Sequence, residues 1–242
     1  MCNCYDADSE IMMRPGISGR KLVELLGEIN ARETWSKVIR PTLQGPVFTS
    51  STEGRLMRWG FERPRARSIN NALIEKRTTM WKKPWQEGRC LTPMSGWYEF
   101  TGPKGNMTCH LLEPEEPGML LAAGLWEEHE EHGFCYTMVM TEADPESMLG
   151  KIHNRMRVIL TPDDGERWLA PPLDDLQPLH RGRVKAAGGA VPTEEGQAGR
   201  RPRSPSGGAC AGGPFLGDCK EDPNFNTPAS PHDLSQLEAA AL

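Results

Sequence analysis

Residues Cys90 to Gly102, CLTPMSGWYEFTG, are the stretch that decides the fold. Its second half is rich in aromatic residues, which favour β-strands. Gly102 to Asn106, GPKGN, has the composition of a turn, and Met107 to Leu112 returns as a second β-prone segment. A strand, a turn and a returning strand predict a β-hairpin.

Strand-like segments continue on both sides of this hairpin. Downstream, Met119 to Trp126 and Phe134 to Thr141 are predicted to pair around a polar turn. Upstream, short strands are predicted at Val47 to Ser50 and Leu56 to Phe61, and an edge strand at Met1 to Tyr5.

Three segments predict helices. Lys21 to Ile29 carries leucines and an isoleucine at helical spacing. Asp144 is a candidate N-cap for a short helix before His153, and Thr161 for another that runs through Leu169. Many strands and few helices predict a β-rich α+β fold with a mainly antiparallel sheet.

Composition limits the class of protein. The 242 residues have a net charge of −5, 37% hydrophobic residues and a mean hydropathy of −0.56. No apolar run approaches the roughly 18 residues of a membrane span, and no secretory signal is recognisable. Seven irregularly spaced cysteines do not suggest a disulfide framework. These features predict an intracellular protein without a membrane segment.

The chain changes character near Pro171. From there Gly, Pro, Ala, Arg and Ser dominate, as in GRRPRSPSGGACAGG, and hydrophobic periodicity vanishes. We therefore expect a folded domain over residues 1–170 and a disordered or loosely attached tail over residues 171–242.

The segment between Gly54 and Cys90 is strongly basic. It holds ten basic and three acidic residues, a local net charge of +7, with four interleaved aromatic residues: Trp59, Phe61, Trp81 and Trp85. Basic groups that follow phosphates and rings that stack on bases are typical of single-stranded nucleic acid binding. The alternative is a solvated basic surface over core tryptophans.

The first residues, Met1-Cys2-Asn3-Cys4, carry a second candidate feature. Removal of Met1 leaves Cys2 with a free α-amine and a thiol on adjacent carbons. An aldehyde can form an imine with the amine and then close to a thiazolidine through sulfur. The same pair can act as an N-terminal nucleophile, or Cys2 can be an accident of sequence.

Two further side chains are ambiguous when taken singly. Glu99 lies among aromatic residues, so it either faces water or is an acid in a poorly solvated pocket that can move protons. His153 lies at a predicted helix-to-strand junction, where it is either structural or part of a site. His129 and His132 are interpreted as surface residues, and neither a metal nor a cofactor is predicted.

Four motifs together resemble one family. Met1-Cys2, Ser68 to Ala72 (SINNA), Gly96 to Phe100 (GWYEF) and His153 to Met156 (HNRM) follow the order and spacing of the SRAP family, SOS response-associated peptidase. Its pattern is MCGR, NAR-x-E, a G-[WY]-[YF]-E-W-like strand and H-x-RMP. The resemblance covers about residues 1–170.

The resemblance implies a curved, mainly antiparallel sheet or barrel with an active-site cleft. It implies binding of single-stranded DNA and a covalent thiazolidine crosslink between abasic (AP) sites and Cys2, which shields the lesion in the DNA damage response. Asn71 would orient the amine or sugar, Glu99 would move protons, and His153 would assist at the sugar ring oxygen.

DNA contacts, a monomeric state and a cytoplasmic location, nucleoid-associated if the protein is bacterial, are also expected from the resemblance. The DNA-contacting residues would be Arg58, Trp59, Arg63, Arg65, Arg67, Arg77, Trp81 and Arg155.

The chain also departs from the family pattern at several positions: Asn3 and Cys4 replace Gly-Arg, Leu73 replaces Arg, and Arg157 replaces Pro. Cys4 is expected to point to the same face as Cys2, where it could compete with it or form a disulfide. A thiol peptidase that uses Cys2, and a single-strand binder whose chemistry has decayed, are the alternative functions.

Overall fold

The computed structural model describes residues 4–14, 19–64, 66–103, 106–115, 118–170 and 184–188. These residues belong to the first of two compact units, Met1–Cys210. Cys2, Arg65 and the predicted tail, apart from residues 184–188, lie outside the described residues.

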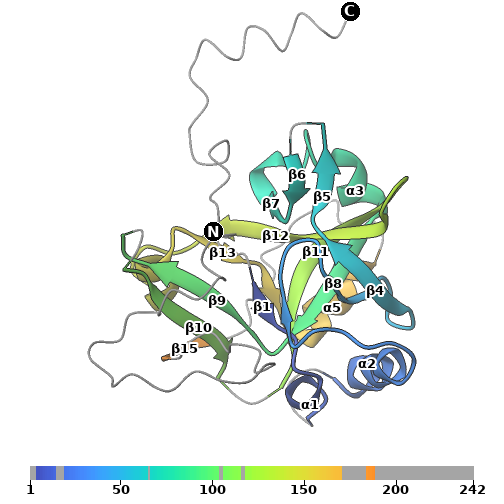
Figure 1. Ribbon diagram of the computed structural model, residues 1–242, viewed down its shortest axis with the longest axis horizontal. Helices are drawn as coiled ribbons and strands as arrows, with labels where there is room; N and C mark the ends of the chain where they lie inside the picture. Colours follow the sequence, from blue (N-terminus) through green and yellow to red (C-terminus); the bar gives the residue numbers. More distant parts are fainter. Residues whose placement is uncertain are drawn as a thin grey trace, which may run out of the picture. The chain divides into compact units, whose positions relative to one another are not determined.

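Five strands close into a ring in the larger sheet (Figure 1). In ring order they are β12 (Gly133–Glu142), β4 (Gly54–Trp59), β3 (Gln44–Phe48), β8 (Arg89–Met94) and β11 (Leu120–His129). Neighbours pair antiparallel except at β12 and β4, which are parallel. Three short strands extend this sheet: β7 (Asn71–Leu73), β13 (Arg155–Arg157) and β14 (Ile159–Leu160).

A second sheet contains the predicted hairpin. Its order is β15 (Val184–Gly188), β10 (Thr108–Pro114), β9 (Gly96–Thr101), β1 (Tyr5–Asp6) and β2 (Val38–Ile39), all antiparallel. The hairpin prediction is therefore confirmed as β9 and β10. Strand β1 pairs on both sides, so the expected edge strand is in fact internal.

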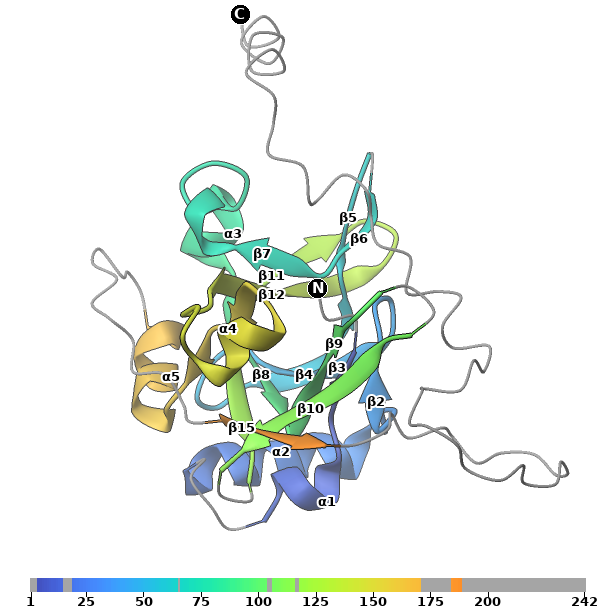
Figure 2. The same ribbon diagram turned by 90° about the vertical axis from the view of Figure 1, so that its left-hand side faces the viewer.

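Helices lie around the strands, as Figure 2 shows. They are α1 (Ser9–Met12), α2 (Arg20–Arg32), α3 (Lys82–Glu87), α4 (Met148–Ile152) and α5 (Pro162–Leu169), with a 3-10 turn at Ile74–Lys76. Thr161 caps α5 as predicted, by accepting a hydrogen bond from the Asp164 N–H. The cap of α4 is Ser147 rather than Asp144, because the Ser147 hydroxyl accepts from the Gly150 N–H.

The core joins the two sheets through aromatic side chains. Tyr5 on β1 packs edge-on against Trp59 on β4, and its hydroxyl lies 2.5 Å from that of Tyr136 on β12. Gly45 on β3 faces both hydroxyls, and a Cβ at this position would collide with them. The contact between the tyrosines therefore requires glycine here. No helix within the described residues is long and apolar enough to cross a membrane.

These sheets confirm the predicted β-rich α+β class. The folded part extends beyond the expected boundary at residue 170, because β15 pairs with β10 over five residues. A composition rich in Ala and Gly concealed this strand, since the strand signal depends on β-branched and aromatic residues.

Candidate functional site

Glu99 lies on a buried face of β9. Side chains alternate along a strand, so Trp97 and Glu99 share one face, and Tyr98 and Phe100 share the other. Glu99 is only 3% exposed, which excludes the alternative that this carboxyl faces water. Its cross-strand neighbour is His110 on β10, whose Nε2 lies 2.8 Å from the Thr101 hydroxyl. The face thus carries an acid beside a histidine.

Cys4 lies on the opposite face of this sheet. It packs in a buried cluster with Val38, Tyr98 and Cys109. Its backbone carbonyl accepts a hydrogen bond from the Tyr98 N–H at 3.4 Å. The Cys4 thiol is therefore directed away from the face that carries Glu99, which argues against its competing there.

A carboxylate network fixes strand β1 beside β9. Asp6 is buried, and it accepts hydrogen bonds from the Ser95 hydroxyl at 2.9 Å, the Tyr98 hydroxyl at 3.3 Å and the Asp8 N–H at 3.0 Å. Burial, followed by the charge of Asp6, raises the pKa of Tyr98, so this hydroxyl stays a donor. The network fixes the position at which the chain enters the sheet.

Asn71 begins β7, which runs parallel to β12. Its register partner there is Met138, and its side chain is 4% exposed. A buried amide next to a strand end can hold a hydrogen-bonding group in one orientation. Asn71 and Glu99 thus come from different sheets.

His153 follows directly after α4. Its Nδ1 accepts a hydrogen bond from the Arg155 N–H at 2.9 Å and lies 3.2 Å from the Arg155 carbonyl oxygen. The Arg155 N–H donates to Nδ1 when this nitrogen of the neutral ring carries no proton. When the ring is protonated, Nδ1 can donate to the Arg155 carbonyl oxygen instead. Burial lowers the pKa of His153, with a contribution from the Arg155 charge. The ring is therefore neutral at pH 7, and its geometry suits proton transfer.

Most of the predicted DNA-contacting arginines are engaged within the chain. Arg63 forms two bonds to Glu127, at 2.5 and 2.8 Å. Arg155 lies 2.5 Å from Glu75 and 3.8 Å from Glu142. Arg58 donates to the carbonyl oxygens of Gly60 and Arg67, and Arg77 donates to that of Ile74.

The two predicted stacking rings lie in the core. Trp59 and Trp81 are 0% and 1% exposed, so neither offers a face to a base. Trp59 also donates from its indole nitrogen to the Asn70 carbonyl at 3.0 Å. This corrects the sequence interpretation: the interleaved aromatics support the fold beneath a charged surface.

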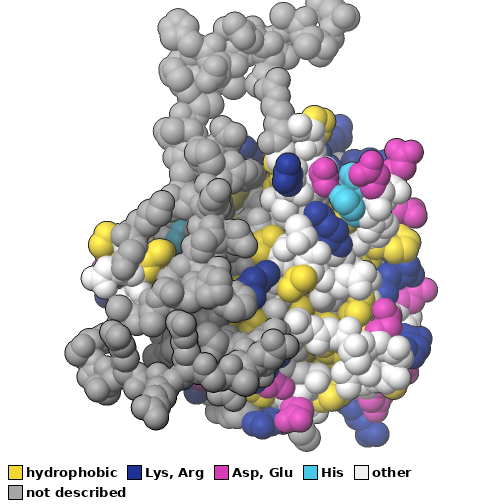
Figure 3. Space-filling view, in the orientation of Figure 1, with side chains coloured by type: hydrophobic (Ala, Val, Ile, Leu, Met, Phe, Trp, Pro, Cys, Tyr) yellow, Lys and Arg dark blue, Asp and Glu magenta, His cyan; other side chains and the backbone are white. Residues whose placement is uncertain are grey.

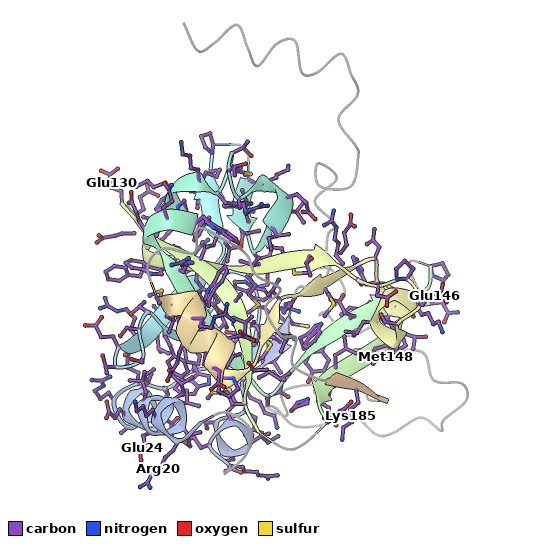
Figure 4. All side chains as sticks on the ribbon, turned by 180° about the vertical axis from the view of Figure 1, so that it is seen from behind. Arg20, Glu24, Glu130, Glu146, Met148 and Lys185 are labelled. Carbon is purple, nitrogen blue, oxygen red and sulfur yellow. The ribbon has the colours of Figure 1, made fainter. Side chains whose placement is uncertain are left out.

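Arg63 and Arg67 line a hollow of about 600 Å³, together with Glu62, Pro64, Ala66, His129 and Glu131. In Figure 3 histidine, basic and acidic side chains gather over this part of the molecule. Glu130, in the adjoining turn, and Glu146, shortly before α4, lie at opposite sides of Figure 4. The hollow is therefore separate from His153.

The histidines beside this hollow have their own contacts. The ring of His132 stacks on that of His129 at 4.8 Å, and its Nε2 lies 2.7 Å from a Glu62 carboxylate oxygen. Throughout the described part of the chain, no three His, Cys, Asp or Glu side chains are arranged to hold a metal ion.

Two residues near the predicted site were missed as candidates. His110 could have been found, because the hairpin turn at Gly102 to Asn106 sets its pairing with Glu99. Arg157 was noted only as a departure, yet it is 0% exposed and its Cζ lies 5.6 Å from the centre of the Trp97 ring. Its burial follows from the pairing of β13 with β12, which nothing local in the sequence indicates.

Named relatives match about half of this chain. An abasic site processing protein of Bacillus subtilis, YobE, is 28% identical over 139 residues, which cover 52% of this chain and 63% of YobE. One from Saccharomyces cerevisiae is 26% identical over 141 residues, covering 54% of this chain and 38% of that protein. The chain thus spans less than two thirds of the length of these relatives.

Solved structures share the fold. A protein from Bordetella bronchiseptica superposes with a TM-score of 0.61 at 21% identity, covering 78% of this chain and all of the other. A protein from Bacteroides thetaiotaomicron gives a TM-score of 0.51 at 18% identity, with coverages of 62% and 74%. A sequence model of one family matches residues 20–188. The chain therefore belongs to the SOS response associated peptidase (SRAP) family.

Proposed function

We propose that this protein captures abasic sites in single-stranded DNA through a covalent bond to Cys2. The observation that carries the proposal is the buried Glu99 on β9, next to a residue, Tyr98, that is hydrogen-bonded to Cys4. The names of its relatives, abasic site processing proteins, support the substrate class.

Chain connectivity limits how far Cys2 can lie from the strand that carries this carboxyl. Consecutive Cα atoms are about 3.8 Å apart, so the Cα atoms of Cys2 and Cys4 are at most about 7.6 Å apart. The Cys4 carbonyl is hydrogen-bonded to Tyr98, the residue before Glu99. Cys2 is therefore two residues along the chain from a point that is fixed on β9. Asparagine at position 3 adopts unusual backbone angles more readily than most residues, which would help Cys2 turn toward that face.

The proposed reaction is balanced without a cofactor. Hydrolysis of the Met1–Cys2 peptide bond first frees the α-amine. The amine nitrogen attacks C1′ of the ring-opened sugar, and loss of one water gives an imine. The thiol sulfur then bonds to the same carbon and its proton passes to nitrogen, which closes a thiazolidine. No electron donor or acceptor is required.

Two side chains would transfer protons, and a third would hold the reacting groups. Glu99 would accept a proton from the attacking amine and return it to the departing hydroxyl. His153, neutral at pH 7 because burial lowers its pKa, would take the sugar hydroxyl proton as the ring opens. Asn71 would hold the amine or the sugar by hydrogen bonds.

The DNA strand would contact exposed basic residues. Arg67 is exposed within β6 (Ala66–Ile69), and Lys76, Lys82 and Lys83 are exposed in the segment that follows Asn71. Charge at these positions can track phosphates without displacing an internal ion pair. These lysines therefore replace the buried tryptophans as proposed contacts.

The test is incubation with single-stranded DNA that carries one abasic site, followed by a denaturing gel. We expect an adduct that survives denaturation and is absent for Cys2→Ala. Cys109→Ala is the matched control, because it removes a thiol on the face that carries Cys4 and should leave the adduct intact. Binding without an adduct would contradict covalent capture and favour a decayed single-strand binder. Cleavage of a peptide substrate that depends on Cys2 would favour a thiol peptidase.

A further inference from the structure

The hollow beside strands β5 (Phe61–Arg63) and β6 (Ala66–Ile69) is not used by the proposed reaction. Its volume of about 600 Å³ lies within the range of sites that bind small ligands, roughly 300–1,000 Å³. Two segments that are far apart in the sequence build it. The residues that line it are Glu62, Arg63, Pro64, Ala66 and Arg67 from the first segment, and His129 and Glu131 from the turn between β11 and β12.

Contacts among these residues hold one imidazole ring in place. The Nδ1 atom of His129 accepts a hydrogen bond from the Glu131 N–H at 3.2 Å. One face of the His129 ring is covered by His132, whose ring centre lies 4.8 Å away at an interplanar angle of 17°. The Nε2 atom of His132 in turn lies 2.7 Å from a Glu62 carboxylate oxygen. A flat ligand in the hollow can therefore stack only on the other face of His129, as unpaired bases do on aromatic side chains.

The charges inside the hollow do not suit a phosphate. Arg63 donates two hydrogen bonds to Glu127, so its charge is largely compensated. The hydrogen bond between His132 and Glu62 lowers the pKa of Glu62, so this carboxyl is ionised at neutral pH. Glu131 adds a second carboxylate, which has no ion-pair partner within the described residues. Two carboxylates repel an anion, and a ligand here should instead be neutral and offer hydrogen-bond donors.

A guanine base has the donors that this lining requires. Among the four DNA bases, guanine alone presents two neighbouring N–H donors on one edge, N1–H and the N2 amine. An ionised carboxylate is an acceptor with two oxygens, so one carboxylate can accept from both. Adenine and cytosine each present a single amine. Thymine presents carbonyl oxygens on both sides of its one N–H, and a carboxylate repels them.

The hollow also lies close to the proposed path of the DNA. Arg67, which is exposed at its rim, is one of the residues that we propose to contact a phosphate. Arg67 precedes Asn71 by four residues, so their Cα atoms are at most about 15 Å apart. A base in the hollow would therefore belong to the same strand as the captured sugar, a few nucleotides away from it.

We propose that the hollow binds one guanine base of the single strand. The base stacks on His129, its N1–H and N2 amine donate to the Glu131 carboxylate, and Arg67 contacts the phosphate of the same nucleotide. This inference rests on the strand-binding part of the proposed function and not on covalent capture. It gives the protein a preference for guanine near the lesion.

The test uses fluorescence anisotropy to measure the affinity of the full-length protein for short strands without an abasic site. One strand contains only thymine, and in the others one central thymine is replaced by guanine or by hypoxanthine. We expect guanine to tighten binding about tenfold, as one paired base contact does. Hypoxanthine keeps N1–H but lacks the N2 amine, so it should recover only part of this gain.

Variants locate the preference in the hollow. Glu131→Gln should abolish it, because the amide NH₂ group opposes one of the two guanine donors. Glu130→Gln is the matched control, since it makes the same change of charge in the same turn. Glu130 does not line the hollow and lies at the edge of the molecule in Figure 4. Both glutamates are exposed, so neither substitution should disturb folding.

Substitutions at His129 test the stacking contact. His129→Phe keeps a ring and should retain the preference for guanine, whereas His129→Ala should lose it. A preference that survives in both Glu131→Gln and His129→Ala would exclude the hollow as its source and overturn the inference.

The remaining outcomes separate this inference from the proposed function. Equal affinities for the guanine and thymine strands would overturn the inference alone, because covalent capture needs no base preference. If no strand binds, the proposed function fails, and calorimetry with free deoxyguanosine monophosphate then tests the hollow. Binding of this nucleotide that is lost in Glu131→Gln would support a guanine site, and no binding would overturn it.

Discussion

At the scale of single residues, chemistry follows from burial. The sequence identified Glu99 and His153 as candidates, because strand alternation and a helix-to-strand junction can be recognised locally. Local patterns could not decide whether either side chain was exposed. Glu99 is buried because it shares a face of β9 with the buried Trp97, and this face is turned toward the other sheet, where Arg157 on β13 lies over the Trp97 ring. Arg157 escaped prediction for the same reason.

Replacing Glu99 by glutamine removes its charge but keeps the shape of the side chain, and we expect this change to slow capture. We expect Glu99→Gln to lower the single-turnover rate of adduct formation by about 10²- to 10⁴-fold, as is typical when an acid–base group is lost. Glu113→Gln is the control, since Glu113 lies on the same hairpin in β10 and pairs with Lys185 at 3.7 Å. Equal rates for Glu99→Gln and wild type would exclude its proposed role.

His153 should make stability depend on pH. Its folded pKa is lowered, so the unfolded chain binds a proton more readily below the ordinary value of about 6.5. The contribution of the neutral ring is therefore present above that value and is lost as pH falls. Urea unfolding at pH 7.5 and 5.5 should show a smaller pH effect for His153→Gln than for wild type. A pH effect of the same size in both proteins would show that His153 does not contribute.

At the scale of elements, the sequence predicts pairs that are near neighbours in the chain. The hairpin of β9 and β10 was predicted correctly because the residues between its strands are typical of a turn. Strand β1 was misjudged as an edge, since its partner β2 lies more than thirty residues away and β9 about ninety. The Arg63 and Glu127 pair was equally out of reach, at a separation of 64 residues.

The Asp6 network should hold β1 in place. Asp6→Ala leaves the Ser95 and Tyr98 hydroxyls and the Asp8 N–H without this acceptor, so we expect a loss of about 1–3 kcal/mol in the free energy of unfolding. Denaturant titration measures this loss. Glu10→Ala, at an exposed position on α1, should change stability little. A similar loss in both variants would show that the network is not specific.

The β5–β6 hairpin (Phe61–Arg63 and Ala66–Ile69) offers a paired test of DNA binding. Arg67→Ala should reduce the slope of log affinity against log salt by about 0.7, the value for one phosphate contact on a single strand. Arg63→Ala should leave more of the slope intact, because Arg63 is held by Glu127. Filter binding at rising salt measures both, and an unchanged slope for Arg67→Ala would remove it from the contact surface.

At the scale of the whole molecule, closure of the barrel depends on long-range pairing. The parallel contact of β12 with β4 joins strands more than seventy residues apart, and no local pattern specifies it. The β-rich class followed from the number of strand-like segments. The end of the folded part could not be predicted in this way, because β15 lacks a strong strand composition.

Strand β15 should contribute to stability. A chain ending at residue 188 should unfold at the same temperature as the full chain, whereas one ending at residue 170 exposes the edge of β10 and should unfold several degrees lower. Thermal unfolding followed by circular dichroism compares the three chains. Identical unfolding temperatures would show that β15 adds nothing.

The most direct test of the central claim is the intact mass of the adduct with single-stranded DNA containing one abasic site. We predict the mass of the chain without Met1, plus the DNA, minus one water, with the modification located on Cys2 after digestion. A modification on another residue, or an adduct formed while Met1 is retained, would contradict covalent capture by the Cys2 amine and thiol.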